Sequence, residues 1–216
     1  MNDRGVALLM GLVLLAAVSL MALMAANSMV LQRRMSANFG AGSTALAQAA
    51  RATEAARAWL DSRADVERES GCSTDCLLPP AIHGPGELPP YPEFESASWW
   101  RIHGLPAGIH PESGEPLASN VAEENPPSWI IEELRYEPRP AAPAGATFAG
   151  IGYYRIFARG VGGHPGSLAF TETIVARPWE GEYDPLPYPV TAPAGNFCAQ
   201  FDPSVPCGTQ GWRQRR

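Results

Sequence analysis

Apolar side chains follow one another almost without interruption from Val6 to Ala26, where Ser19 is the only polar residue and Gly11 the only weak helix former. As an α-helix these residues would span about 32 Å, because each residue adds about 1.5 Å along the axis. That length is enough to cross the hydrocarbon core of a bilayer. The pattern therefore predicts a membrane-spanning helix over residues 6–26.

The helical pattern continues past Asn27 but becomes one-sided. Small or apolar side chains recur there at alternating spacings of three and four, namely at Leu46, Ala49, Thr53, Ala56 and Leu60. Such spacing places them on one narrow stripe of a helix, which is typical of a helix that packs against a core. Arg51, Glu54, Arg57 and Asp61 fall outside the stripe, and we expect them to face water.

The two segments together predict one nearly continuous helix. Residues 6–26 are apolar on all sides, and residues 27–66 form an amphipathic continuation. Gly40 and Gly42 are expected to loosen this helix locally, since glycine is a poor helix former.

The composition changes in the C-terminal domain, residues 67–216, because all 22 prolines lie at or after Pro79. Four segments have the character of strands: Ser98–Ile102, Ser128–Glu137, Gly152–Val161 and Ser167–Arg177. The last two flank the turn sequence GGHPG and are expected to form a hairpin. Residues 71–91 and 178–216 are expected to be proline-rich loops. The fold class expected is α+β, a long N-terminal helix packed on a small antiparallel sheet.

The charge is divided unevenly along the chain. Residues 1–60 contain five Arg, one Asp and one Glu, a net charge of +3. Since the whole chain carries −6, the remaining residues carry −9. An acidic C-terminal domain argues against nucleic acid as a partner, because binding to phosphates needs a basic surface.

Four cysteines are present, Cys72, Cys76, Cys198 and Cys207. In an exported chain an even number favours two disulfides, for which three connectivities exist. We predict local pairing, Cys72 with Cys76 and Cys198 with Cys207. A zinc site with four thiolates is the alternative, but its spacing would be unusual for paired zinc knuckles, and no metal site is expected.

Sequence signatures of catalysis are lacking. The chain has no GxSxG, HExxH or CxxC motif and no phosphate-binding glycine-rich loop. The four histidines, at 83, 103, 110 and 164, are scattered without the spacing of metal ligands. We expect no enzymatic activity and no cofactor.

Three interpretations of the N-terminal helix remain open. A secretory signal peptide could be cut after Ala17-Val18-Ser19, but the new chain would begin at Leu20 and still be apolar. A plain single-pass anchor is the second. The third is a helix that is retained and later assembles with other helices.

Several segments resemble the PilX-type minor pilins of the bacterial type IV pilus. The similarity includes the charged leader MNDRG before the apolar helix, and the pattern L-x-x-R-M-x-x-N formed by Leu31, Arg34, Met35 and Asn38. It also includes the alanine-rich helix around Glu54, the segment YYRIFARGVGG and the ending CGTQGWRQRR.

The resemblance implies a processing site. In this family, prepilin peptidase cuts after the leader glycine, which places the cut between Gly5 and Val6 and makes residues 1–5 the leader. Val6 would then become the methylated N-terminus. The mature chain would cross the bacterial inner membrane once, with a periplasmic C-terminal domain, before assembly into the surface pilus. The implied partners are prepilin peptidase, membrane lipid, the inner-membrane assembly machinery, and major and minor pilins bound through the N-terminal helix.

The family also implies what to expect at two further places. Major pilins usually carry a glutamate at the position of Met10, whereas minor pilins of this type often lack it. We therefore expect the subunit to prime the pilus or to occupy its tip. The family's exposed loop closed by C-terminal cysteines corresponds to Cys198–Cys207. The alternatives are a minor pseudopilin of a type II secretion system and a membrane-anchored periplasmic binding module.

Overall fold

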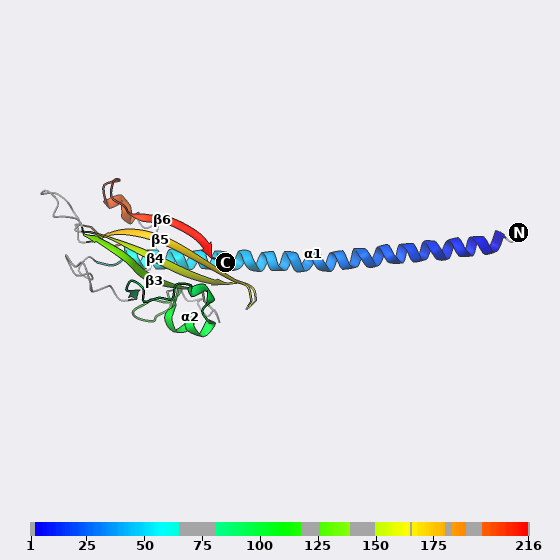
Figure 1. The fold of residues 1–216 in the computed structure, drawn as a ribbon, viewed down its shortest axis with the longest axis horizontal. Helices are drawn as coiled ribbons and strands as arrows, with labels where there is room; N and C mark the ends of the chain where they lie inside the picture. Colours follow the sequence, from blue (N-terminus) through cyan, green and yellow to red (C-terminus); the bar gives the residue numbers. More distant parts are fainter. Residues whose placement is uncertain are drawn as a thin grey trace. The chain divides into compact units, whose positions relative to one another are not determined.

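The computed structural model describes residues 3–64, 81–117, 126–138, 150–164, 166–179, 183–188 and 196–215, with backbone alone for residues 3–8 (Figure 1). The contacts divide the chain into two units, Met1–Ala41 and Gly42–Arg216. We refer to the first as the N-terminal unit and to the second as the head.

Helix α1 is a single element of 59 residues, Asp3–Asp61. It runs through Gly40 and Gly42 without a break, so the expected loosening at these glycines is wrong. A Cβ atom at either position would meet nothing within 4 Å, so no close approach requires glycine there. The helix ends at Asp61, earlier than the predicted end at residue 66.

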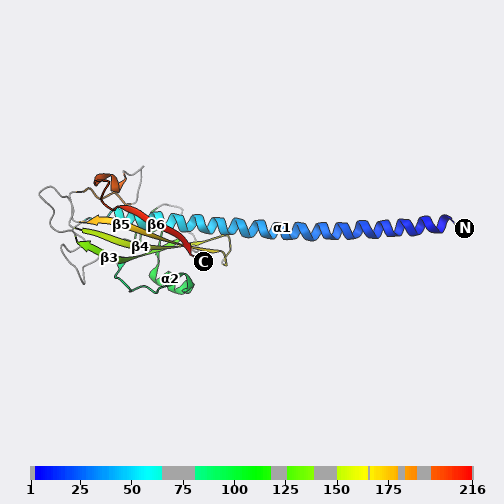
Figure 2. The ribbon, with the colours of Figure 1, turned by 45° about the horizontal axis from the view of Figure 1, so that its top comes forward.

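The head contains a sheet in the order β1-β3-β4-β5-β6, with β2 paired to β3 (Figures 1 and 2). The strands are β1 (Ile82–His83), β2 (Leu105–Pro106), β3 (Ser128–Pro138), β4 (Gly150–Val161), β5 (Leu168–Trp179) and β6 (Gly208–Arg215). Every pairing is antiparallel except that of β1 with β3, which is parallel. The α+β class is confirmed, with a mixed sheet in place of a purely antiparallel one.

The predicted hairpin is confirmed as β4 and β5, which pair from Val161 with Leu168 to Gly150 with Trp179 without a register shift. Strand β3 joins β4 in antiparallel pairing with one irregularity, between Glu133 and Arg135. These three strands agree with the sequence prediction to within two residues at each end.

The segment Ser98–Ile102, predicted to be a strand, is instead helical. It lies within α2 (Ala97–His103), and the Oγ of Ser96 accepts a hydrogen bond from the backbone N–H of Trp99 at 3.1 Å. This N-cap satisfies one of the free donors at the helix start, which favours the helix over the strand that the tryptophans suggested. Two short 3₁₀ helices, η2 (Pro92–Phe94) and η3 (Phe197–Gln200), complete the described helices.

Residues 208–215, predicted to belong to a proline-rich loop, form the strand β6 at one edge of the sheet. β6 begins at Gly208, whose φ of +78° suits glycine. Its pairing with β5 contains a register shift between Ile174 and Val175.

The sheet has a different cover on each face. The C-terminal part of α1 lies on one face, where the predicted stripe, apart from the half-buried Leu46, is buried together with Trp59, Trp129, Ile131 and Trp179. On the other face, α2 buries Trp100 against Ile130 and Phe157. Because adjacent strand residues point to opposite faces, Ile130 and Ile131 belong to different clusters.

The helix approaches the sheet closely at Gly160 of β4. A Cβ atom built there would lie 2.0 Å from the backbone oxygen of Ala45 and 2.4 Å from the backbone nitrogen of Ala49. Only a residue without a side chain fits at this distance.

Candidate assembly surface

The N-terminal unit presents an apolar helix surface. Its large hydrophobic side chains are more than half exposed, and between residues 9 and 24 they are Leu9, Met10, Leu12, Val13, Leu14, Leu15, Val18, Leu20, Met21, Leu23 and Met24. The helix is long and apolar enough to cross a membrane. The hydroxyl of Ser19 donates to the backbone oxygen of Leu15 at 2.8 Å, so this polar group needs no water.

Charged residues are nearly absent from this part of α1. No acidic residue occurs between Asp3 and Glu54, and Arg33 and Arg34 are the first basic residues after Arg4. Apolar exposure nevertheless continues past the two arginines to Phe39, which is 80% exposed. An exposed apolar surface of this extent is typical of a segment covered by lipid or by other helices.

The sequence-predicted site residues fall in different parts of the molecule. Gly5 and Val6 belong to the first turns of α1, and Met10 is 65% exposed on the same helix. Cys198 and Cys207 form the predicted disulfide, with a Cα–Cα distance of 5.5 Å, in the head. Cys72 and Cys76 lie outside the described residues.

The C-terminal disulfide closes a short segment that leads into β6. A Cβ atom built on Gly208, the first residue of β6, would lie 3.3 Å from the sulfur of Cys198. The adjoining η3 buries Phe197 in a cluster with Ile151 and Ala176. The cross-link therefore fixes the start of β6 against a hydrophobic cluster of the head.

A fully buried cation lies next to this cluster. The guanidinium of Arg177 is 3.6 Å from the ring centre of Trp179 and donates to the backbone oxygen of Arg63 and to the hydroxyl of Tyr183. Burial lowers the pKa of Arg177 from its ordinary value. Contacts with the electron-rich ring faces partly compensate for the loss of water around this charge.

Asp61, which the sequence analysis placed toward water, is buried. Its side chain lies 3.8 Å from that of Arg57, and burial raises the pKa of its carboxyl to about 6, although Arg177 and Arg57 oppose this shift. The buried surface of α1 is therefore wider in its last turn than the stripe of apolar residues predicted. Both the stripe and the side chain next to it are covered there.

The raised pKa of Asp61 predicts a pH-dependent stability of the head. The folded head holds this proton up to about pH 6, whereas the unfolded chain releases it near 3.8. Stability is therefore lost as the pH rises between these values and stays lower above them. We expect Asp61→Asn, which stays neutral, to raise the free energy of unfolding by about 2–3 kcal/mol near pH 8.

The measurement is urea denaturation of the detergent-solubilised full chain at several pH values. Near pH 4 the variant and the wild type should differ by less than about 0.5 kcal/mol, because both carry a neutral group. A constant difference across the whole range would show that the carboxyl of Asp61 is not what titrates.

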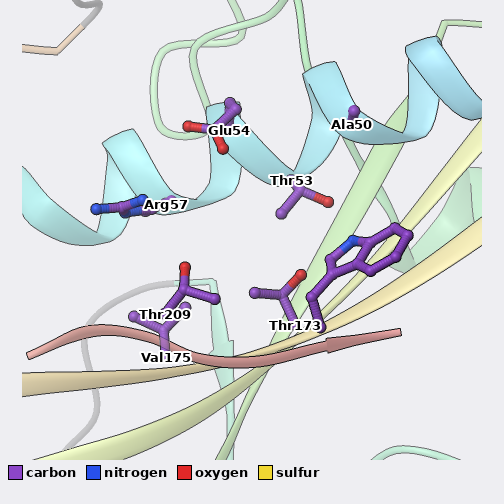
Figure 3. A pocket seen from close by; sticks show the side chains of 8 residues that line it. Ala50, Thr53, Glu54, Arg57, Thr173, Val175 and Thr209 are labelled. Atoms are coloured by element: carbon purple, nitrogen blue, oxygen red, sulfur yellow. The ribbon is translucent and has the colours of Figure 1, made fainter. Parts of the chain in front are cut away.

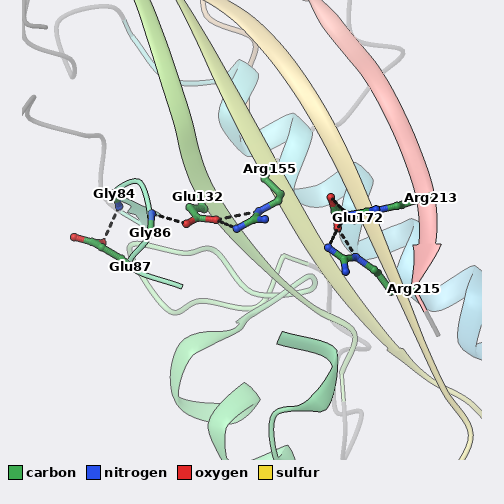
Figure 4. Close-up of polar contacts among 8 residues, drawn as sticks. All are labelled: Gly84, Gly86, Glu87, Glu132, Arg155, Glu172, Arg213 and Arg215. Carbon is green, nitrogen blue, oxygen red and sulfur yellow. Dashed lines mark hydrogen bonds and ion pairs between the residues drawn. The ribbon is translucent and has the colours of Figure 1, made fainter. Parts of the chain in front are cut away.

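The face of the sheet that carries α2 also holds a row of ion pairs (Figure 4). Glu132 accepts from Arg155 and from the backbone N–H of Gly86, and Glu172 accepts from Arg213 and Arg215. Both carboxylates are almost fully buried. Each carboxylate is paired with arginine, and loss of the arginine would leave an uncompensated buried charge. These ion pairs therefore have a structural role in the sheet.

The part of the chain that the structure describes has no group of three or more His, Cys, Asp or Glu that could hold a metal ion. Its histidines have structural contacts: His103 stacks on Trp99, and the Nδ1 of His110 accepts from backbone N–H groups in its own turn.

No protein-family model, curated protein or solved structure matches the chain.

Proposed function

We propose that this protein is a minor pilin, a non-enzymatic subunit that primes a type IV pilus or enters it at low copy number. The observation that carries the proposal is the helix α1, one element of 59 residues with two kinds of surface. Its first part is apolar and exposed, and its last part is buried against the sheet of the head. An anchor that continues directly into the core of its own head is the layout expected of a pilin.

The exposed surface needs an apolar environment at every stage. A large apolar side chain left in water costs about 1.5–3 kcal/mol relative to burial, and the N-terminal unit exposes many of them. Lipid covers them before assembly. Once the subunit leaves the membrane, the helices of other pilins take the place of lipid, and the small residues Ala7, Gly11, Ala16, Ala17 and Ala22 allow close helix packing.

The absence of a carboxylate near the N-terminus fits a minor subunit. With Met10 in place of the usual glutamate, the helix has no acidic partner for the methylated amine of a neighbouring subunit. Burying an unpaired charge in a helical fibre is unfavourable, so neutral Met10 suits a position with fewer neighbours. That position is the tip or the priming complex.

The test is mass spectrometry of the mature N-terminus in the host bacterium. We expect a chain that begins at Val6 and carries one methyl group on its amine. In Gly5→Glu the leader should remain attached, because the small glycine that fits the peptidase is gone. A wild-type chain that retains Met1, or one that begins at Leu20, would rule out prepilin processing.

Processing alone does not separate a pilus from a secretion pseudopilus. Deletion of the gene should lower the number of surface filaments, and the chain should be found in sheared filaments. Unchanged filaments together with a secretion defect would instead support the minor pseudopilin.

A further inference from the structure

A groove opens between the last turns of α1 and the edge of the sheet (Figure 3). It has a volume of about 210 Å³ and is lined by Ala50, Thr53, Glu54, Arg57, Thr173, Val175, Thr209 and Trp212. Most small-molecule sites are larger, about 300–1,000 Å³, so this one suits amino-acid side chains better than a cofactor. All of its lining belongs to the head.

The wall formed by β6 is unusual in its exposure. Trp212 is 57% exposed although it borders an apolar groove, and it pairs in register with Thr173 of β5 on the groove floor. An exposed tryptophan beside a groove is typical of an interaction site, because the indole offers a large rigid contact area. The hydroxyl of Thr173 is buried and has no hydrogen-bond partner among the described residues.

The same strand is an edge of the sheet in the part of the chain that the structure describes. β6 ends the strand order, and its ladder partner among the described strands is β5 alone. Beyond the register shift, Gly211 to Arg215 pair regularly with β5 over five residues. The backbone groups on the other side of β6 are therefore placed to pair with a further strand.

The side chains of β6 differ in charge between the two faces of the sheet. Arg213 points away from the groove toward Glu172, but its side chain stays 60% exposed and Arg215 shares the same carboxylate. On the groove face, Trp212 and Thr209 of β6 carry no charge, and the two charged lining residues, Glu54 and Arg57, belong to α1. A strand that pairs with β6 would thus be complementary with acidic residues on the arginine face and apolar residues on the groove face.

We propose that β6 and its groove bind an extended segment of another protein in which apolar and acidic residues alternate. The segment extends the sheet by one strand, and its apolar side chains cover Trp212 and close the open side of the groove. Its acidic side chains meet Arg213. This site lies in the head and is independent of helix assembly, so it stands whether or not the chain is a pilin.

A second copy of the chain is a less suitable occupant. An isologous β6–β6 pair would bring the exposed Arg213 of both copies to one face, where the Glu172 of each copy already serves both Arg213 and Arg215. Like charges across a strand pair are unfavourable.

The experiment uses the detergent-solubilised full chain and a dye-labelled peptide of eight residues, the length of β6, in which valine or phenylalanine alternates with glutamate. Fluorescence anisotropy should show saturable binding. Trp212→Ala should weaken it by at least about tenfold, because the main apolar contact is lost. The matched control is Ile102→Ala on α2, a side chain that is 78% exposed and should leave binding unchanged.

Charge and backbone are tested separately. A peptide with lysine in place of glutamate should bind poorly to the wild type and better to Arg213→Glu, while a peptide with proline at alternate positions should not bind. The proposal is overturned if the peptide fails to bind, if Trp212→Ala binds it equally, or if the proline peptide binds as well. Self-association of the full chain that Trp212→Ala abolishes would also overturn it, since the occupant would then be a second copy.

Discussion

A single methyl group at position 160 is expected to destabilise the head by at least about 3 kcal/mol. In Gly160→Ala the new Cβ would lie 2.0 Å from the backbone oxygen of Ala45, well inside van der Waals contact. Backbone atoms of a helix cannot rotate away as a side chain can. Relief therefore requires α1 to move off β4, which weakens the packing on both sides of the contact.

Urea denaturation of the full chain in detergent, followed by tryptophan fluorescence, measures this loss. Gly163→Ala is the matched control, because a Cβ there meets nothing within 4 Å. The control should change stability by less than about 0.5 kcal/mol. Equal midpoints for the two variants would mean that helix and strand do not approach as closely as described.

The second large effect is expected at the other end of the same interface. Trp59 is completely buried, its ring centre lies 5.6 Å from that of Trp129, and the guanidinium of Arg63 lies over its ring at 4.7 Å. Trp59→Ala removes the largest helix side chain from this cluster and leaves a cavity. We expect a loss of about 3–5 kcal/mol in the free energy of unfolding.

Trp212→Ala provides the comparison, since it deletes the same side chain from an exposed position. We expect it to cost less than about 1 kcal/mol. If the two tryptophan variants unfolded at the same denaturant concentration, the core of the head would not be centred on α1.

The parts of the fold that follow from regular hydrophobic spacing were predicted from the sequence. The stripe from Leu46 to Leu60 has the period of a helix that faces one surface, and it is buried as expected apart from Leu46, which is half-buried. Strands β4 and β5 are rich in apolar residues and largely buried, because both faces of the sheet are covered, whereas β3 contains three glutamates and one arginine beside its apolar residues.

The edge strand was missed for a physical reason. β6 has the sequence GTQGWRQR, which lacks any alternation of apolar and polar residues. A strand at an edge buries few side chains, so it carries little of the signal on which strand prediction depends. The groove beside it could not be predicted, because Glu54 and Arg57 of the helix and Trp212 of the strand are far apart in the sequence.

Two other errors came from neighbours that the sequence does not reveal. Asp61 lies outside the apolar stripe, yet it is enclosed because other parts of the head close over the last turn of α1, where Leu186 donates a backbone hydrogen bond to its carbonyl at 3.2 Å. In α2, the tryptophans favour a strand, but the cap at Ser96 starts a helix.

The processing site was inferred by resemblance alone. Gly5 and Val6 have no chemistry of their own that marks a cleavage site, so processing between them stays a prediction. Met10 is likewise informative only by comparison, because major pilins usually carry a glutamate at this position.

The packing of α1 on the sheet differs between two places along the helix. Near Ala45 and Ala49 the helix backbone almost touches Gly160, whereas around Trp59 bulky rings separate the helix from the strands. A force that pulled α1 toward its N-terminus would move the indole of Trp59 toward the contact at Gly160, where no Cβ atom fits. Such a movement would tighten the contact between α1 and β4, so the packing of the head resists a pull on its helix in that direction.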